Sequence, residues 1–161
     1  MNASFPLLYT NDVTPEFLRT LDKSPFTEQQ LASFDEHALV IIQKQQAYAI
    51  DHPAIAIYRM AAEGSQTRDG GVVKQATGPV EFKLENGQEV RAAQKGDSVV
   101  YPDGTKAQIV TGAGKGNSNV ALVGSYLSNG DEIINTPQGI ALIMARKGVQ
   151  KADDFLSTIE N

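Results

Sequence analysis

The stretch "GSQTRDGGVV" at residues 64–73 combines a Gly-Ser pair, a threonine, an aspartate and paired glycines. A step through small residues into Gly-Ser or Gly-Asp occurs three times: "RMAAEGS" ends at Ser65, "VRAAQKGD" at Asp97 and "VALVGS" at Ser125. Between these segments lie two matching blocks that start with glycine, "GPVEFKLENGQEV" and "GAGKGNSNV". A period of about 30 residues is typical of repeat architectures, so we expect one small structural unit to occur three times.

The distribution of glycine divides the chain into three zones. None of the 14 glycines lies in residues 1–53, and most of them fall between Gly64 and Gly130. We therefore expect a helical N-terminal extension at residues 1–53, a repeat domain at residues 54–138, and a tail at residues 139–161.

The first zone carries the signals that start and stop helices. Thr14-Pro15 supplies an N-cap followed by proline at the first helical position, which predicts a short helix over residues 15–23. Thr27 and Gln30 have the spacing of a capping box, which predicts a second helix that continues to about Ala49. Its apolar stripe consists of Leu31, Phe34, Ala38, Ile41 and Ile42. Pro53 should end this helix, because proline disfavours the helical conformation in the residue before it.

The second zone alternates short apolar runs with turns, which is typical of an all-β architecture. The runs are residues 80–84, 97–101, 107–110, 120–127 and 131–135. Turns are expected at residues 85–87, 103–104, 112–114 and 129–130. In the tail, residues 140–146 predict a further strand and residues 151–160 favour a short helix. We therefore predict a mainly β fold of short antiparallel strands, preceded by helices.

Composition excludes several classes of protein. With 161 residues, of which 41% are hydrophobic, the chain can bury the core of one domain. A net charge of -5 argues against a nucleic-acid partner, and the absence of cysteine excludes disulfides and thiolate zinc sites. No apolar run approaches the ~20 residues of a membrane span, and the start "MNASFPLLYT" lacks a basic, apolar secretory signal. We expect synthesis in the cytoplasm without a signal peptide, and no stable membrane insertion.

The order of the motifs resembles that of the PAAR-repeat proteins, which form the pointed tip of type VI secretion spikes and of related contractile phage tails. "GSQTRDGG" matches the first turn of that pattern at Gly64, Thr67, Gly70 and Gly71. "NGQEVRAAQKGD" matches the block that names the family at Asn86, Gly87, Ala92, Gly96 and Asp97, with Val90-Arg91 in place of the usual Pro-Ala. "YPDGTKAQIVTGAG" and "VALVGSYLSNGD" match the later turns. The resemblance covers about half of the chain, from Ile55 to Gln138.

The resemblance implies a small conical fold with pseudo-threefold repeats. It gives structural turn roles to Gly64, Gly70, Gly71, Gly87, Gly96, Asp97, Gly104 and Gly124. It also implies a non-catalytic function, in which one chain caps a trimeric β-helical spike of the VgrG type and sharpens it for membrane piercing. One chain with three similar lobes can cover three equivalent strand edges, which would otherwise be open to aggregation. The helical zone would recruit an effector or adaptor, and the chain would leave the cell with the spike or travel in a phage tail.

Better-known members of this family hold zinc near the tip with histidines and a cysteine. At the corresponding positions this chain has Asp69, Tyr101, Asp103 and Asn129. Structural zinc favours imidazole and thiolate ligands, and the two histidines, His37 and His52, lie outside the repeat. Asp69 and Asp103 leave a hard cation as the alternative, although an aspartate beside glycine usually caps its own turn. We therefore predict that no metal or other cofactor is bound, and that hydrogen bonds and packing hold the tip.

The sequence contains no catalytic constellation. "GAGKG" at residues 112–116 lacks the Gly-Lys-Ser/Thr ending of a phosphate loop, and we interpret it as a glycine-rich hairpin turn. Two alternatives to a spike tip remain: an effector whose activity lies in the helical zone, with the β region as its delivery module, and a small β-barrel binding module unrelated to spikes. Equivalent positions of Gly64, Gly96 and Gly124 around one axis would distinguish the spike tip from the β-barrel.

Overall fold

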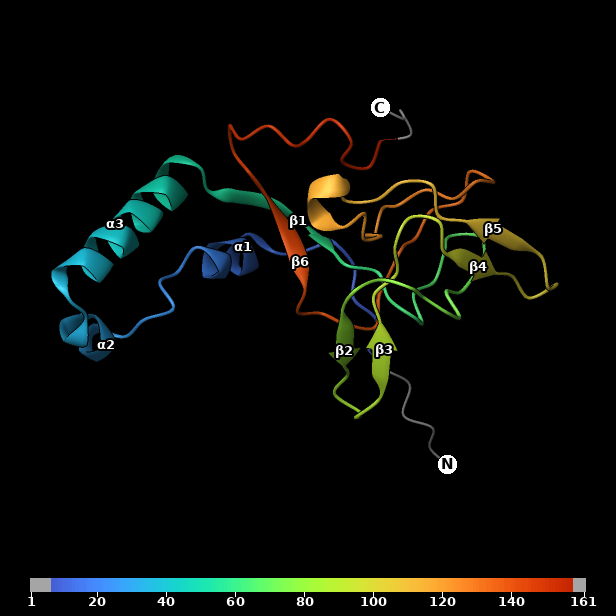
Figure 1. The fold of residues 1–161 in the computed structure, drawn as a ribbon, viewed down its shortest axis with the longest axis horizontal. Coiled ribbons are helices and arrows are strands. Elements are labelled where there is room, and N and C mark those ends of the chain that lie inside the picture. The colour runs from blue at the N-terminus through green and yellow to red at the C-terminus, as the bar shows by residue number, and fades with distance from the viewer. Residues whose placement is uncertain (1–6, 158–161) are drawn as a thin grey trace. The chain divides into compact units, whose positions relative to one another are not determined.

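The structure is a computed structural model that describes residues 7–157. Its elements are α1 (Pro15–Leu21), α2 (Glu28–Ser33), α3 (Glu36–Asp51), β1 (Ala54–Arg59), β2 (Glu81–Lys83), β3 (Glu89–Arg91), β4 (Ser98–Val100), β5 (Lys106–Gln108), the 3₁₀-helix η1 (Lys115–Asn117) and β6 (Leu142–Arg146), shown in Figure 1. Parts of "MNASFPLLYT" and of the predicted helix at residues 151–160 lie outside the described residues.

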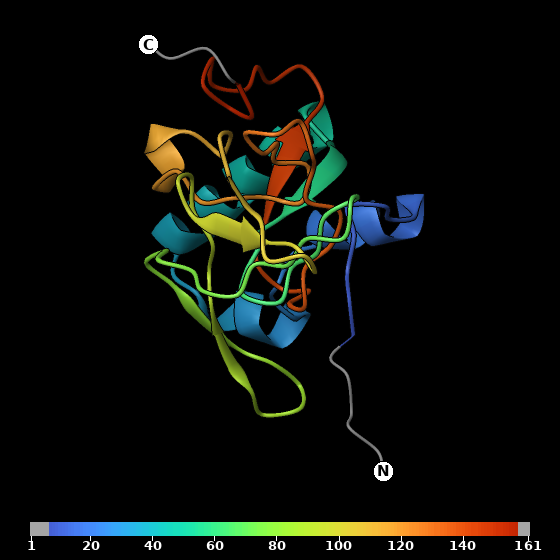
Figure 2. The same ribbon diagram turned by 90° about the vertical axis from the view of Figure 1, so that its right-hand side faces the viewer.

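The chain forms two compact units. The first, here called the hairpin unit, contains residues 7–11, 58–143 and 151–157. The second, here called the helical unit, contains residues 12–57 and 144–150. Figures 1 and 2 show that the hairpin unit consists mainly of extended segments and turns, with η1 as a short helix. These units are interleaved along the sequence, whereas the three compositional zones are consecutive.

The first two helices begin at their capping residues. The Thr14 hydroxyl accepts a hydrogen bond from the Phe17 amide, and α1 starts at Pro15. Before α2, Thr27 and Gln30 form both hydrogen bonds of a capping box. Each cap satisfies amide groups that the first turn of a helix leaves without a partner, which is why the local sequence is sufficient to place these starts.

The prediction of one helix from Thr27 to Ala49 is wrong, because the chain is extended at Phe34 with a ψ of 149°. Asp35 then caps a new helix, α3, by accepting a hydrogen bond of 2.8 Å from the Ala38 amide. Aspartate competes with helix formation when it bonds nearby amides, and it is favoured at caps for the same reason. The predicted apolar stripe therefore extends over two helices.

The strands form small antiparallel sheets. β1 pairs with β6, β2 with β3, and β4 with β5. Phe82 is opposite Val90 in the second sheet, and Val99 is opposite Ala107 in the third. The chain thus combines short antiparallel strands with a few helices, so it is a small mixed fold and the predicted predominance of β structure is met only in part.

Two predicted elements differ from the structure. Residues 120–127 do not form one strand, because Gly124 has a φ of 107° and turns the chain. Leu122 before this turn pairs with Met60, whereas Leu127 after it pairs with Ile109. In the tail, residues 153–156 form turns instead of the predicted helix, and Leu156 is held by a hydrogen bond from its amide to the Gly112 carbonyl. The strand β1 has no counterpart among the predicted runs, although "AIAIYR" is typical of a strand.

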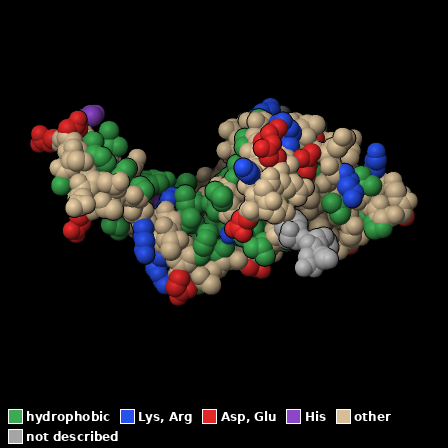
Figure 3. All heavy atoms as spheres, turned by 90° about the horizontal axis from the view of Figure 1, so that it is seen from below, with side chains coloured by type: hydrophobic (Ala, Val, Ile, Leu, Met, Phe, Trp, Pro, Cys, Tyr) green, Lys and Arg blue, Asp and Glu red, His purple; other side chains and the backbone are tan. Residues whose placement is uncertain are grey.

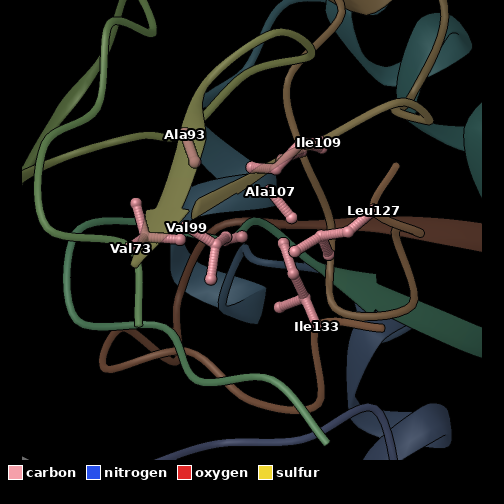
Figure 4. Close-up of a cluster of buried hydrophobic side chains, with 9 residues drawn as sticks. Val73, Ala93, Val99, Ala107, Ile109, Leu127 and Ile133 are labelled. Carbon is pink, nitrogen blue, oxygen red and sulfur yellow. The ribbon is translucent and has the colours of Figure 1, made fainter. Parts of the chain in front are cut away.

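The main hydrophobic core lies inside the hairpin unit. Figure 4 shows side chains that converge from the segments of this unit. The cluster contains Ala61, Val73, Ala93, Val99, Ala107, Ile109, Ala121, Leu127 and Ile133. Every one of these side chains is buried, and they are small or β-branched apart from one leucine. Such side chains allow several extended backbones to approach one another closely.

Candidate functional site

Three hairpins in the hairpin unit form the same hydrogen bonds. We call residues 65–73 hairpin 1, residues 97–109 hairpin 2 and residues 125–133 hairpin 3. The glycine before each hairpin has a positive φ: 98° at Gly64, 99° at Gly96 and 107° at Gly124. Its amide donates a hydrogen bond of 2.8 Å to the carbonyl of the last hairpin residue in all three cases. A side chain is strained at such a φ, which explains why glycine opens each hairpin.

The residue after each of these glycines closes the turn. The side chains of Ser65, Asp97 and Ser125 accept hydrogen bonds from the amides of Ala62, Gln94 and Leu122 at 3.0, 2.9 and 2.9 Å. All three acceptor side chains are buried. The repeated Gly-Ser or Gly-Asp pair therefore has a physical cause, since one residue supplies the backbone conformation and the next supplies the capping oxygen.

The segments that lead into the hairpins meet in a closed ring. The Ala61 amide donates to the Ala121 carbonyl at 2.9 Å, the Ala121 amide to the Ala93 carbonyl at 2.8 Å, and the Ala93 amide to the Ala61 carbonyl at 2.9 Å. All three alanines are completely buried. The third hydrogen bond returns to the first residue, so the ring has no open end. Alanine suits these positions because three backbones approach one another there.

The hairpins are linked in the same cyclic order. The Arg68 amide of hairpin 1 donates to the Glu132 carbonyl of hairpin 3. The Ser128 amide of hairpin 3 donates to the Gln108 backbone carbonyl of hairpin 2, and the Val100 amide of hairpin 2 donates to the Val72 carbonyl of hairpin 1. Each hairpin therefore uses one side for one neighbour and the other side for the second, which leaves no edge strand between the three hairpins.

A polar cluster joins the turn ends of the three hairpins. We define it as Thr67 of hairpin 1, Tyr101 of hairpin 2, and Asn129 and Asp131 of hairpin 3. The Tyr101 hydroxyl donates to Oδ2 of Asp131 at 2.6 Å, and the Asn129 side-chain amide donates to the Tyr101 hydroxyl at 2.9 Å. Oδ1 of Asp131 accepts hydrogen bonds from the Glu132 amide at 2.7 Å and from the Asp69 amide of hairpin 1 at 3.1 Å.

The polar cluster also sets the ionisation of its members. Burial alone would raise the pKa of Asp131, but the hydrogen bonds from Thr67, Tyr101 and the two amides outweigh it and lower this pKa. Burial and the hydrogen bond to Asp131 raise the pKa of Tyr101, so its hydroxyl retains the proton that it donates. At neutral pH the cluster is therefore one buried carboxylate surrounded by donors.

The positions that the resemblance relates to zinc ligands are only partly close together. Tyr101 and Asn129 meet in the polar cluster, and Asp69 contributes its amide while its carboxylate is exposed and lies 3.6 Å from Arg68. Asp103 instead accepts hydrogen bonds from the amide and the hydroxyl of Thr105 in its own turn, which lower its pKa. Within residues 7–157 no group of three or more His, Cys, Asp or Glu side chains is arranged to hold a metal ion.

The two histidines belong to the helical unit. Nδ1 of His52 lies 2.9 Å from the Lys147 carbonyl, and its ring contacts the ring of Tyr48. His37 is exposed on α3. His52 thus lies at the C-terminal end of α3, and His37 lies on a solvent-exposed face of the same helix.

Asp131 is the residue of the cluster that the sequence patterns did not single out. It follows the Asn129-Gly130 turn, and a turn position of this kind is usually exposed. In the structure Asp131 is completely buried. The only signal in the sequence was its place after the third turn, at the position that Gly71 occupies in hairpin 1.

Gly71 has a steric role next to the polar cluster. A Cβ atom at this position would lie 2.4 Å from Cγ1 of Val99, 3.0 Å from the Thr67 hydroxyl oxygen and 3.0 Å from Cε1 of Tyr101. The predicted turn glycines Gly70, Gly87 and Gly104 differ from it, since each has a positive φ and open space around it. Gly71 thus permits hairpins 1 and 2 to approach each other beside Tyr101.

Two further features concern the length of the helices and the distribution of basic side chains on the surface. No helix among the described residues is long and apolar enough to cross a membrane. On the face shown in Figure 3, basic side chains lie at several separate places.

Comparisons with protein-family models, curated proteins and solved structures gave no match to this chain.

Proposed function

We propose that the hairpin unit is the tip of a spike, of the kind formed by PAAR-repeat proteins, and that one chain caps the end of a trimeric β-helical spike of the VgrG type. The observation that carries this proposal is the closed ring of Ala61, Ala93 and Ala121 with its three similar hairpins. A single chain with this bonding repeats the same backbone hydrogen bonds three times in a closed cycle. Such a repeat would suit the three equal strand edges at the end of a trimer.

The arrangement of the chain around the ring supports the capping mechanism. Three pairs of segments leave the ring: β1 with β6, β2 with β3, and the segment 113–120, which is closed by a hydrogen bond from Ala113 to Val120. The three hairpins follow the ring along the chain, and the polar cluster joins their turn ends. Hairpins that are bonded to one another in this way suit a cap, which must end without open strand edges.

The proposed role is structural rather than catalytic. The tip would sharpen the spike for membrane piercing, and it would leave the cell with the spike or travel in a phage tail. The alternative of a small β-barrel binding module gives no reason for a threefold repeat, whereas Gly64, Gly96 and Gly124 each open a hairpin with the same hydrogen bonds. This difference favours the spike tip.

The helical unit would provide the surface that recruits an effector or adaptor. The structure describes every residue of the helices α1, α2 and α3. None of these helices contains a buried residue. Val40, Ile41 and Tyr48 of α3 are exposed by 43%, 45% and 47%. A helix of this length is marginal in water unless an apolar face is covered, so exposure of this face favours a bound partner.

The experiment that tests the proposal is copurification of the chain with a trimeric VgrG-type spike, with the stoichiometry measured by native mass spectrometry. We expect one chain per trimer. In the variant Ala93→Leu a larger side chain disrupts the ring, so we expect the complex to be lost. The matched control Ala152→Leu places the same change at an exposed position of the hairpin unit and should bind normally. Three chains per trimer, or no complex of the natural chain, would refute the capping mechanism.

A further inference from the structure

The turn ends of the three hairpins contain no ligand set that fits a metal ion. Both carboxylate oxygens of Asp131 already accept hydrogen bonds, from the Tyr101 hydroxyl and from the Asp69 and Glu132 amides. The Asn129 side chain directs its NH₂ group, which cannot coordinate a cation, at the Tyr101 hydroxyl. A cation at this place would have to displace these donors, and neither imidazole nor thiolate is present to replace them.

We propose that the Asp131 carboxylate is the hub of a metal-free clip that locks the turn ends of the three hairpins together. Its biological role, to keep a spike tip closed, rests on the function proposed above. The clip itself follows from the hydrogen bonds of the polar cluster, and it does not depend on the identity of the spike.

Each hairpin contributes a different donor to the clip. Hairpin 1 supplies the Asp69 amide, and next to it the Arg68 guanidinium donates to the Gly130 carbonyl at 3.1 Å. Hairpin 2 supplies the Tyr101 hydroxyl at 2.6 Å. Hairpin 3 carries Asp131 itself and the Glu132 amide at 2.7 Å. One side chain therefore accepts hydrogen bonds from all three hairpins.

Burial makes this arrangement cooperative. Asp131 is completely buried, and hydrogen bonds to an ionised acceptor are stronger than those between neutral groups. In a buried network the loss of one member leaves the remaining donors without partners, so the effect extends beyond the residue that is changed. Removal of the Asp131 charge should therefore loosen hairpins 1 and 2 as well as hairpin 3.

The test is hydrogen exchange, followed by mass spectrometry, of the full-length chain and three variants. Asp131→Asn keeps the shape of the side chain and removes its charge, and Tyr101→Phe removes only the hydroxyl that links hairpin 2. Asp103→Asn is the matched control, because it makes the same chemical change in a turn where the carboxylate bonds only Thr105 of its own hairpin. Peptides that cover residues 66–72, 99–106 and 126–132 report on the three turns separately.

We expect Asp131→Asn to accelerate exchange in all three turns by about tenfold or more. Tyr101→Phe should accelerate it in hairpins 2 and 3, and Asp103→Asn should affect hairpin 2 alone. If Asp131→Asn loosened only hairpin 3, the clip would be refuted.

A second measurement addresses the metal. Elemental analysis of the purified chain should find no stoichiometric zinc or iron, and a chelator should leave the exchange rates unchanged. About one tightly bound metal per chain, with faster exchange after chelation, would overturn the metal-free clip. Either result is independent of spike binding: a chain that binds one per trimer but contains a metal would contradict the clip and leave the proposed function intact.

Discussion

Replacement of Gly71 by alanine tests the close approach of hairpins 1 and 2. The new Cβ would lie 2.4 Å from Cγ1 of Val99, a completely buried and β-branched side chain that cannot rotate away easily. Overpacking of a tight core costs ~1–3 kcal/mol, and the reduced freedom of the unfolded chain offsets ~0.4–1 kcal/mol of this. Because a separation of 2.4 Å places the overpacking cost at the upper end of this range, we expect a net loss of about 2 kcal/mol in the free energy of unfolding, which lowers Tm by about 4–8 °C in a chain of this size.

Gly116→Ala is the matched control, and the expected effect has the opposite sign. Gly116 has no heavy atom within 4 Å of an added Cβ, and its φ lies outside the left-handed region. The same substitution should therefore stabilise the chain by ~0.4–1 kcal/mol through the unfolded state alone.

The assay should report on the hairpin unit separately, because a chain with two compact units need not unfold in one step. Thermal unfolding followed by circular dichroism gives the change in Tm, and hydrogen exchange of peptides from residues 58–143 assigns it to the hairpin unit. Equal Tm values for Gly71→Ala and Gly116→Ala would show that hairpins 1 and 2 do not pack as described.

Three further predictions concern the equivalence of the hairpins, the buried carboxylate and the helix caps. Ile109→Val and Ile133→Val each remove one methylene from equivalent buried positions. Each should lower the free energy of unfolding, measured by urea unfolding, by ~1 kcal/mol. A difference above ~1 kcal/mol between the two variants would contradict that equivalence. Because hydrogen bonds lower the pKa of Asp131 in spite of its burial, this carboxylate stabilises the fold above about pH 4, and the stabilisation is lost as the pH falls through the lowered pKa. Urea unfolding between about pH 5 and pH 2 should therefore depend less on pH in Asp131→Asn than in the natural chain, and an unchanged slope would show that Asp131 is not responsible. Asp35→Ala removes the acceptor of the Ala38 amide and should destabilise α3 by ~1 kcal/mol, seen as lower helical circular dichroism, whereas Asp35→Asn keeps a cap and should change little.

The elements that could be predicted are those that depend on neighbouring residues. Thr14 and Thr27 cap the helices that their spacing predicts, and the strand at residues 140–146 is present as β6. The glycines Gly64, Gly96 and Gly124 have the positive φ values that turns require. In each case the hydrogen bond or the steric effect acts within a few positions of the residue concerned.

The errors arose where the predicted element competed with a second local signal or with a distant pairing partner. The apolar stripe favours helix through Phe34, but Asp35 forms a stronger local cap and divides the helix. Apolar residues favour a strand over residues 120–127, but the two halves of this run pair with different segments on either side of Gly124. In the tail, the Leu156 amide bonds a distant carbonyl, that of Gly112, in place of a helical partner. Periodicity cannot decide the last two cases because the pairing partners are far away in the sequence.

The order of glycines, capping oxygens and small apolar residues was sufficient to specify three turns and the starts of α1 and α2, since each involves a backbone conformation and an acceptor only a few residues away. Closure of the ring joins residues that are far apart in the sequence, so only the tertiary structure shows it. The same is true of the polar cluster. Asp131 accepts hydrogen bonds from Tyr101 and from the Asp69 amide, which lie 30 and 62 positions away. Nothing in the turn "SNGD" distinguishes a buried hub from an exposed cap, because burial depends on how the other two hairpins fold over it.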